Sequence, residues 1–428
     1  MAGKRVAAYT LGCKVNQYDT EAMLESFERA GYTAVPFNEE ADVYIVNTCT
    51  VTGTGDQKSM KTIRRLARLH PDCAIVAAGC LTQREPEKLL ALDNVRLAVG
   101  VQRRSEAVEL LEQAIREDTK ISAVTPLKGA GFENLFVSRH EGKTRATMKI
   151  QEGCDRYCSY CIIPFVRGPV RSMEMDALRK EAKRLADAGY REIVVTGILI
   201  AGFGRGTDYS LIDAVRAVHD TPGVERVRLG SLEPVAADDA FAKAVSEMPN
   251  AAHQFHLSLQ SGSASVLRRM NRRYTPDEYF AACENLRRYM PDAAITTDII
   301  VGFPGETEAE FEETIAFAKK CGLARLHVFP YSRRSGTVAD RMPDQVPESV
   351  KHERSLRLIA VGNDLAAEYA AGTLGTIQRV LFETECGEGL CEGYTGTYVR
   401  VRAKAQPGEM KCVRITRVEG DTAYGEDA

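Results

Sequence analysis

The chain has 428 residues, of which 44% are hydrophobic and 27% charged, and its formal net charge is −3. This length exceeds what one ordinary hydrophobic core covers, so we expect two or three domains. The composition is typical of a soluble globular protein, and no run of about 18 apolar residues predicts a membrane span. The slightly negative charge gives no general argument for a nucleic-acid partner, which must be argued from local features.

The first residues lead from a short basic stretch into a strand-like run, without the apolar segment of a signal peptide. We therefore expect a cytoplasmic protein. Its 12 cysteines then need an explanation, because reducing compartments discourage stable disulfides. Metal binding or redox chemistry is the interpretation that this cysteine content favours.

The N-terminal region alternates short apolar strands with amphipathic helices, which predicts a doubly wound parallel sheet. Strands are expected at 6–12, 43–49, 74–80 and 96–100, and helices at 17–30 and 58–69. Cys13, Cys49 and Cys80 each stand at the end of one strand. Because the carboxyl ends of such strands form the ligand crevice, we expect these cysteines to converge there. Buried free cysteines are also common core residues, and this alternative stays open.

A second alternation of strands and helices follows residues 117–139, which lack a sustained period and are interpreted as a linker. Strands are expected at 146–150, 192–198, 226–231, 254–259, 294–302 and 325–332, and helices near 173–188, 211–219, 238–248, up to 289, and 308–320. Strand–helix steps of this kind over roughly 200 residues predict a partial (β/α) barrel with functional loops at the strand carboxyl ends. A helix after Pro347 is expected to close it.

The tail has short β-rich pieces at 376–383, 393–403 and 411–420, separated by glycine-containing turns. This pattern of short strands and turns predicts a small antiparallel β-barrel. The predicted fold class is therefore α/β, with a doubly wound parallel-sheet domain, a partial barrel and a small β-barrel. Its expected boundaries are 3–116, a linker at 117–139, 140–371 and 372–428.

The motif GCDRYCSYCIIP places Cys154, Cys158 and Cys161 in one loop after a strand. Three thiolates can bind three irons of a four-iron cluster and leave the fourth iron open to an outside ligand. A zinc site is the alternative. Zinc usually takes four protein ligands, however, and no fourth Cys or His follows at suitable spacing. We therefore favour an iron–sulfur cluster.

The CxxxCxxC spacing, with Tyr160 before the last cysteine, resembles that of the radical S-adenosylmethionine (SAM) superfamily. Other motifs follow in one order along the chain: TLGCKVNQYDTE, VNTCTVT, AAGCLTQ, RLGSLEP, SLQSGS, MNRRYT and TTDIIVGFPGET. Together with the β-rich tail, these motifs resemble the radical SAM methylthiotransferase family over essentially the whole chain. The tail would then be the TRAM domain of that family, which implies RNA binding.

The resemblance implies two [4Fe-4S] clusters and S-adenosyl-L-methionine as cofactors. The catalytic cluster would lie on Cys154, Cys158 and Cys161, and the second cluster on Cys13, Cys49 and Cys80. One electron would cleave SAM, bound at the open iron, to a deoxyadenosyl radical. The further cofactor-binding residues that the resemblance implies are Tyr160, Thr196, Gly197, Glu233 and Gln260. The implied partners are the tRNA anticodon stem-loop, an electron donor protein or reductant, and a sulfur source, with no membrane.

Two groups of cations could hold phosphates of an RNA. Residues 139–171 contain seven cations against Glu141, Glu152 and Asp155, and the helix at 58–69 has a second group. A solvated charged face is the alternative for both groups. In the tail, Tyr394 and Tyr398 are predicted to stack on bases.

The leading function is insertion of a methylthio group at C2 of N6-threonylcarbamoyladenosine, adjacent to the anticodon, with a second SAM as methyl donor. TLGCKVNQYDTE and NTCTVTGTGDQKS resemble that branch of the family, whereas the isopentenyladenosine branch tends to have YGCQMN and the ribosomal branch LGCPKN. The alternatives are methylthiolation of isopentenyladenosine tRNA or of a ribosomal protein, and a non-catalytic iron–sulfur module that binds RNA or senses redox state.

Overall fold

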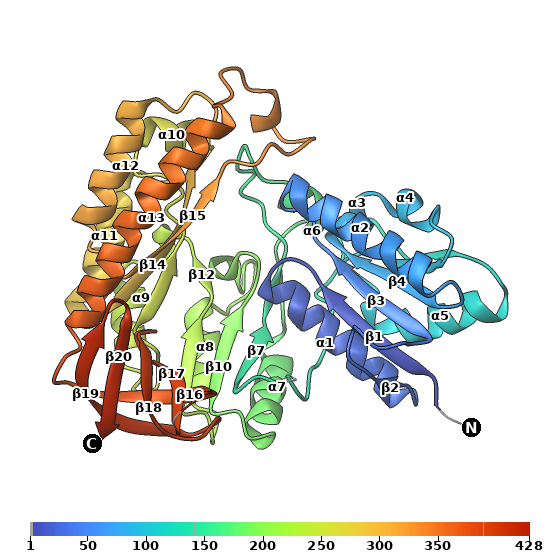
Figure 1. Cartoon of the computed structure of the whole chain (residues 1–428), viewed down its shortest axis with the longest axis horizontal. Helices are drawn as coiled ribbons and strands as arrows, with labels where there is room; N and C mark the ends of the chain where they lie inside the picture. Colours follow the sequence, from blue (N-terminus) through green and yellow to red (C-terminus); the bar gives the residue numbers. More distant parts are fainter. Residues whose placement is uncertain (1–2, 141, 388) are drawn as a thin grey trace. The chain divides into compact units, whose positions relative to one another are not determined.

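The computed structural model describes residues 3–140, 142–387 and 389–428 (Figure 1). Its contacts divide the chain into two compact units. The first holds the described residues up to Arg139 together with 149–177 and 332–340, and the second holds the remaining described residues. The loop with Cys154, Cys158 and Cys161 therefore belongs to the same unit as the N-terminal cysteines.

The first unit contains a six-stranded parallel sheet with the strand order β2-β1-β3-β4-β5-β6. The strands are β1 Arg5–Thr10, β2 Thr33–Ala34, β3 Val43–Thr48, β4 Ala74–Gly79, β5 Val95–Val99 and β6 Ile121–Ser122. The helices are α1 Lys14–Arg29, α2 Gly53–Leu69, α3 Cys80–Arg84, α4 Pro86–Leu90 and α5 Ala107–Arg116. The predicted doubly wound parallel sheet is thus confirmed.

Both faces of this sheet are covered by helices, because successive residues of its central strands are apolar and point to opposite faces. Val43 and Ile45 of β3 pack in one core cluster with residues of α1 and α5. Tyr44 and Val46 of the same strand pack in a second cluster with residues of α2. Strands that are buried on both faces in this way are typical of parallel sheets.

The predicted linker is part of the first unit. Ile121–Ser122 adds strand β6 at the sheet edge, and the chain then continues without regular structure. Leu135 and Val137 lie in a small core cluster with Tyr18 and Ala22 of α1. This segment therefore has fixed contacts with α1.

The second unit has a sheet with the order β11-β10-β7 and a parallel sheet with the order β12-β13-β14-β15. A parallel bridge between Val227 and Ala251 connects them. The strands are β7 Arg145–Lys149, whose last residue belongs to the first unit, β10 Glu192–Thr196, β11 Arg226–Leu229, β12 Ser231–Leu232, β13 Gln254–Leu257, β14 Ala294–Val301 and β15 Arg325–Pro330. The predicted partial-barrel domain is confirmed.

The helices of this domain lie between its strands and after β15. They are α7 Met175–Asp187, α8 Leu211–His219, α9 Asp239–Ser246, α10 Ala264–Arg269, α11 Pro276–Tyr289, α12 Glu308–Lys320 and α13 Glu348–Ala371. Ser210 with Asp213 and Thr307 with Glu310 form reciprocal capping boxes at the starts of α8 and α12. No described helix is both long and apolar enough to cross a membrane.

The tail is a closed β-barrel with the strand order β16-β17-β18-β20-β19 (Figure 1). Its strands are β16 Ile377–Gly387, β17 Leu390–Thr395, β18 Arg400–Lys404, β19 Met410–Glu419 and β20 Thr422–Asp427. The small barrel was correctly predicted, but β20 was missed, and its pairing with β18 is parallel rather than antiparallel.

The tail is held on the central domain by arginines, all within the second unit. Arg226 and Arg228 of β11 donate to the carbonyl oxygens of Tyr394 at 3.1 Å and Thr395 at 3.0 Å. Both arginines also bind the buried carboxylate of Glu192. The rings of Tyr394 and Tyr398 stack with centroids 4.7 Å apart.

The Arg145 guanidinium lies 5.4 Å from the ring centroid of Tyr394 and 5.2 Å from that of Tyr398. Both rings therefore pack against a cation of the central domain and are partly exposed, and their stacking on RNA bases stays a prediction.

Candidate metal centres

The structure brings Cys13, Cys49 and Cys80 to one edge of the first sheet. Cys13 is the N-cap of α1 after β1, Cys49 follows β3, and Cys80 is the first residue of α3 after β4. Because β1, β3 and β4 are neighbouring parallel strands, their carboxyl ends meet at this edge. This convergence is what the strand pattern predicts.

A glycine allows the first loop to approach Cys49 closely. Gly12 has a φ of +108°, and a Cβ placed on it would lie 3.1 Å from both Cβ and Sγ of Cys49. Asn16 fixes the same loop, because its amide donates to the carbonyl oxygens of Leu11 at 2.7 Å and Thr48 at 3.0 Å. Asn16 therefore ties the end of β3 to the loop that carries Cys13.

The thiols at this edge differ in burial. Cys13 is exposed, whereas Cys49 and Cys80 are buried. Burial raises the pKa of the Cys49 thiol and raises that of Cys80 to about 11, and the neighbouring Cys13 adds to both shifts. These two metal-free thiols are therefore protonated at neutral pH. Binding of a metal at this edge must release their protons.

The second set of cysteines lies in the loop between β8 Gln151–Glu152 and α6 Ile163–Arg167. Cys158 is buried, and Cys154 and Cys161 are partly exposed. The loop is tightly turned, since the Cys161 amide donates to the Cys158 carbonyl oxygen at 2.9 Å and the Ile163 amide donates to Cys161 Sγ at 3.4 Å.

The first cysteine of this loop is fixed by close backbone contacts. The Cys154 amide donates to the Gly168 carbonyl oxygen at 3.0 Å. Gly153 has a φ of +78°, and a Cβ there would lie 1.9 Å from the Pro169 carbonyl oxygen, so only glycine fits at this position.

The cysteine loop also presents an aromatic pair. Tyr157 has a φ of +50°, a backbone region in which residues other than glycine are uncommon and which is enriched at functional sites. Its exposed ring contacts the exposed ring of Phe165 edge to face, with centroids 5.7 Å apart. Tyr160, which directly precedes Cys161, is partly exposed.

A cluster fits both sets by the chemistry of their donors. Within the described residues, no three side chains of His, Cys, Asp or Glu are already arranged to hold a metal ion. Each set nevertheless offers three thiols, the number that binds three irons of a four-iron cluster. Two of the three thiols in the N-terminal set are buried at one edge of the sheet, and those of the second set lie in one tight loop.

Thr196, Gly197, Glu233 and Gln260 all lie in the second unit, at or after the carboxyl ends of strands. Thr196 ends β10 and Gly197 follows it, Glu233 follows β12, and Gln260 follows β13. Gln260 has a φ of +68°, and its backbone N–H donates to the Asp298 carbonyl oxygen at 2.9 Å. These positions match the predicted strand ends, and the cofactor contacts themselves remain a prediction.

The predicted basic patch at 139–171 lies only partly at the surface, where Arg139 is exposed and Lys143 and Arg156 are partly exposed. Lys149, Arg167 and Arg171 are buried, and Arg145 packs on the tail. Glu141, which entered the charge count, lies outside the described residues. Lys149 and Arg167 bind Glu152, which is close in the sequence, and Asp19, which lies far away in the sequence and was not in the charge count.

Six charged side chains, three acidic and three basic, form one buried network in the first unit. They are Asp19, Arg104, Glu133, Lys149, Glu152 and Arg167. Burial alone would raise the pKa of Glu152, but Arg167, Lys149 and Arg104 hold it well below its usual value. The ionised carboxylate therefore stabilises the unit at neutral pH. That contribution is lost as the pH falls through the lowered pKa.

The basic residues of α2 are the cationic group that does reach the surface. A groove of about 640 Å³ runs along this helix and is lined by Lys61, Arg64, Arg65, Arg68 and Lys88, with Asp56 at one end. Asp56 is already paired with Arg334 and Arg84.

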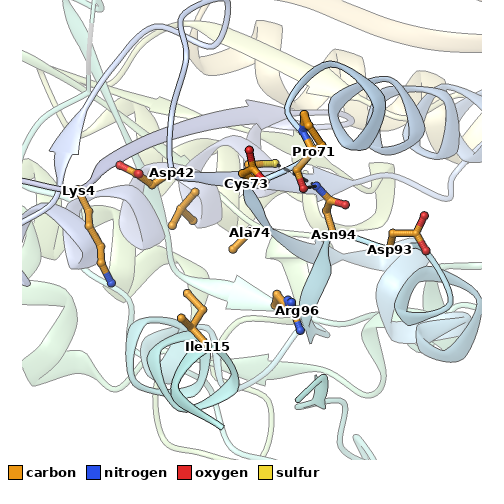
Figure 2. A pocket seen from close by; sticks show the side chains of 11 residues that line it. Lys4, Asp42, Pro71, Cys73, Ala74, Asp93, Asn94, Arg96 and Ile115 are labelled. Carbon is orange, nitrogen blue, oxygen red and sulfur yellow. Dashed lines mark hydrogen bonds between the residues drawn. The ribbon is translucent and has the colours of Figure 1, made fainter. Parts of the chain in front are cut away.

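A separate hollow of about 390 Å³ lies at the amino ends of the strands of the same sheet (Figure 2). Cys73 lines it, and the Asn94 amide lies 3.9 Å from Cys73 Sγ. Ligand crevices of open α/β sheets lie at the opposite, carboxyl edge, so this hollow is not part of the cluster sites. Cys73, Cys283 and Cys321 are buried, as predicted for core residues.

Comparisons with known proteins bear on both regions. Residues 5–100, which include Cys13, Cys49 and Cys80, match the Uncharacterized protein family UPF0004. Residues 148–318, which include the cysteine loop, match the Radical SAM superfamily. The chain is 41% identical to the threonylcarbamoyladenosine tRNA methylthiotransferase MtaB of Bacillus subtilis, over 98% of this chain and 95% of that protein.

Two further proteins show a relationship over nearly the whole chain. A tRNA-2-methylthio-N(6)-dimethylallyladenosine synthase of Natranaerobius thermophilus is 32% identical over 99% of this chain and 97% of that protein. The radical S-adenosylmethionine methyltransferase TsrM from Kitasatospora setae, solved with cobalamin and a [4Fe-4S] cluster bound, aligns with a TM-score of 0.59. That alignment covers 91% of this chain and 77% of that chain at 13% identity, which shows a shared fold alone.

Proposed function

Because this chain belongs to the radical SAM tRNA methylthiotransferase family, we propose that it inserts a methylthio group at C2 of N6-threonylcarbamoyladenosine next to the tRNA anticodon. The observation that carries this proposal is the 41% identity to a threonylcarbamoyladenosine enzyme over nearly the full length of both chains. The relative that acts on dimethylallyladenosine is less similar, at 32%. The two converged sets of cysteines support the same assignment.

The chain supplies ligands and orientation for this chemistry. When bound, a [4Fe-4S] cluster on Cys154, Cys158 and Cys161 supplies the electron that cleaves SAM. The tight backbone around Gly153 holds these thiols at fixed positions. Cys13, Cys49 and Cys80 hold the second cluster at the edge of the sheet.

The remaining residues of the predicted SAM site are assigned by the family resemblance and by their places in the chain. We propose that Thr196, Gly197, Glu233 and Gln260 contact SAM from the strand ends of the central domain, and that Tyr160 does so from the cysteine loop. A reductant supplies the electron, and a sulfur source replenishes the transferred sulfur. The proposed location is the cytoplasm, where tRNA is modified.

Nucleoside mass spectrometry tests this function. Total tRNA from cells that lack the gene should contain N6-threonylcarbamoyladenosine but no 2-methylthio derivative. The wild-type gene should restore the derivative, and a Cys158→Ala gene should not. An unchanged nucleoside profile in cells without the gene would refute the proposed function.

The anticodon stem-loop has a candidate contact surface on α2. Lys58, Lys61, Arg65 and Arg68 occupy positions i, i+3, i+7 and i+10 and therefore share one side of the helix. At about 1.5 Å per residue, this stripe extends about 15 Å. No ion pair among the described residues involves these four cations, and all four are exposed. The helix begins shortly after Cys49, so phosphates held along it lie close to the first set of cysteines.

Neutral substitutions on α2 should weaken tRNA binding mainly at low salt. In the Lys61→Gln/Arg65→Gln variant, we expect the slope of log affinity against log salt to fall in magnitude by about 1.4 to 1.8, because two phosphate contacts are lost. The matched control is Arg29→Gln/Arg116→Gln, which removes the same charge from α1 and α5 on the other face of the sheet. Fluorescence anisotropy with labelled tRNA at several salt concentrations measures both slopes. Equal slopes for the two variants would contradict this placement of the RNA.

A further inference from the structure

Arg167 connects the cysteine loop to the N-terminal set of cysteines. It is the last residue of α6, six positions after Cys161, and its side chain is fully buried. Its Nε donates to Cys80 Sγ at 3.2 Å. Its Nη2 donates to Asn16 Oδ1, and its Nη1 donates to Glu152 and, at 3.3 Å, to Asp19.

Counting Arg171, the buried side chains around Arg167 carry one more positive than negative charge. The buried network contains three carboxylates and three cations, one of which is Arg167. Arg171 is a fourth buried cation, and its Nε and Nη2 have no hydrogen-bond partner among the described residues. Buried charges are usually compensated. When Cys80 binds iron, its thiolate, hydrogen-bonded to Arg167, supplies a fourth negative charge.

We propose that Arg167 is a positioning residue for the second cluster, whose Nε–H donates to the Cys80 sulfur that binds iron and stabilises the reduced form of that cluster. This inference rests on the proposed function only in assigning a cluster to Cys13, Cys49 and Cys80. The side chain comes from the helix that follows Cys161. The segment from Cys154 to Arg167 therefore carries the three ligands of the catalytic cluster, and its Arg167 polarises Cys80, a ligand of the second cluster.

The physical basis is the fixed fork of the guanidinium. Hydrogen bonds to ligand sulfurs and nearby positive charge favour the reduced, more negative state of an iron–sulfur cluster, and the effect is stronger away from water. Arg167 meets Cys80, Asn16 and two carboxylates at once through three nitrogens. A lysine ammonium cannot span these acceptors, since it is a single charged point. The Cys80 sulfur is thus held in one orientation.

The experiment compares Arg167→Gln with Arg104→Gln in a protein that carries Cys154→Ala, Cys158→Ala and Cys161→Ala, so that only the second cluster contributes. Arg104 binds Asp19 and Glu152 in the same network but has no hydrogen bond to a cysteine among the described residues. Redox titration monitored by electron paramagnetic resonance gives the midpoint potential, and iron per chain is measured alongside. We expect Arg167→Gln to destabilise the reduced form about tenfold, a fall of about 59 mV for one electron. Arg104→Gln removes a charge from the same network but no hydrogen bond to Cys80, so it should lower the potential much less.

The outcomes distinguish the proposed role of Arg167 from an effect on folding and from the cluster assignment. If Arg167→Gln does not fold, Arg167→Lys keeps the charge but loses the Nε donor, and a lowered potential in that variant supports the proposal. An unchanged potential in the Arg167 variants, or an equal fall in Arg104→Gln, would overturn it. A protein without iron at the first set of cysteines would refute the cluster assignment together with this role. Iron with an unchanged potential would refute the role of Arg167 alone.

Discussion

Replacing Cys154, Cys158 and Cys161 together with Ala should abolish the reductive cleavage of SAM and leave about half of the iron, because one of two four-iron clusters is lost. The three thiols are the ligands that leave one iron open, and no other cysteine lies in this loop. Deoxyadenosine measured by liquid chromatography with mass spectrometry reports cleavage. Iron per chain is measured on the same anaerobic sample.

The reciprocal variant separates the two sets of cysteines. With Cys13, Cys49 and Cys80 replaced by Ala, we expect deoxyadenosine to form still, whereas methylthiolated tRNA should not appear. Cys73→Ala is the matched control, because Cys73 is a buried cysteine at the opposite edge of the same sheet. Its iron content and both activities should remain those of the wild type. Persistent SAM cleavage without Cys154, Cys158 and Cys161 would refute the assignment of the radical site.

Local sequence patterns predicted the positions of these cysteines well. Cys13, Cys49 and Cys80 each follow a run of apolar residues, and parallel strands with short connections leave little choice about which edge their ends share. The helices at 211–219 and 308–320 match the structure because their capping boxes fix the first turns. These features depend on residues within a few positions of one another.

The buried network could not be predicted in this way. Lys149 and Arg167 bind Asp19, which lies 130 and 148 positions away in the sequence. The residues next to a cation in a cysteine loop do not indicate whether that cation binds a phosphate or forms a buried ion pair. The motif CKVNQYD contained the relevant partners, since Asn16 and Asp19 both contact Arg167, but their spacing indicated only a helix.

One contact of the tail could not be predicted for a related reason. Tyr394 and Tyr398 alternate with buried residues on strand-like segments, which fits either an exposed aromatic platform or a packed interface. In the structure both rings contact Arg145, which lies about 250 positions earlier in the chain.

The second large effect that we expect is a strong preference of the enzyme between two modified nucleosides in tRNA. Purified enzyme should methylthiolate tRNA that carries N6-threonylcarbamoyladenosine and leave tRNA that carries isopentenyladenosine almost unchanged. The first nucleoside has a carboxylate and hydrogen-bonding groups, whereas the isopentenyl group is apolar. A site with polar groups for the former leaves them unpaired with the latter, which is worth a factor of about 10⁴ in kcat/KM. The base must also leave its stack, which an anticodon loop allows at modest cost.

Within the TLGCKVN motif, we propose Lys14 as the contact for this carboxylate. Of Lys14, Val15 and Asn16, only Lys14 is exposed, and it stands next to Cys13. Val15 and Asn16 are buried, and Asn16 is occupied by Leu11, Thr48 and Arg167. Lys14→Gln, which gives the residue found in YGCQMN, should lower kcat/KM for the threonylcarbamoyl substrate about tenfold, the effect of one charged hydrogen bond. Cleavage of SAM should be unaffected.

Both tRNAs are best compared as one transcript sequence that differs only in the modification, with product nucleosides measured by mass spectrometry. Arg29→Gln serves as the control, because it removes a positive charge from the last turn of α1, at the opposite end of the helix from Cys13. It should leave the preference unchanged. Faster methylthiolation of the isopentenyl substrate would place the enzyme in the other branch of the family. The radical chemistry would still stand, because it depends on Cys154, Cys158 and Cys161 rather than on the nucleoside pocket.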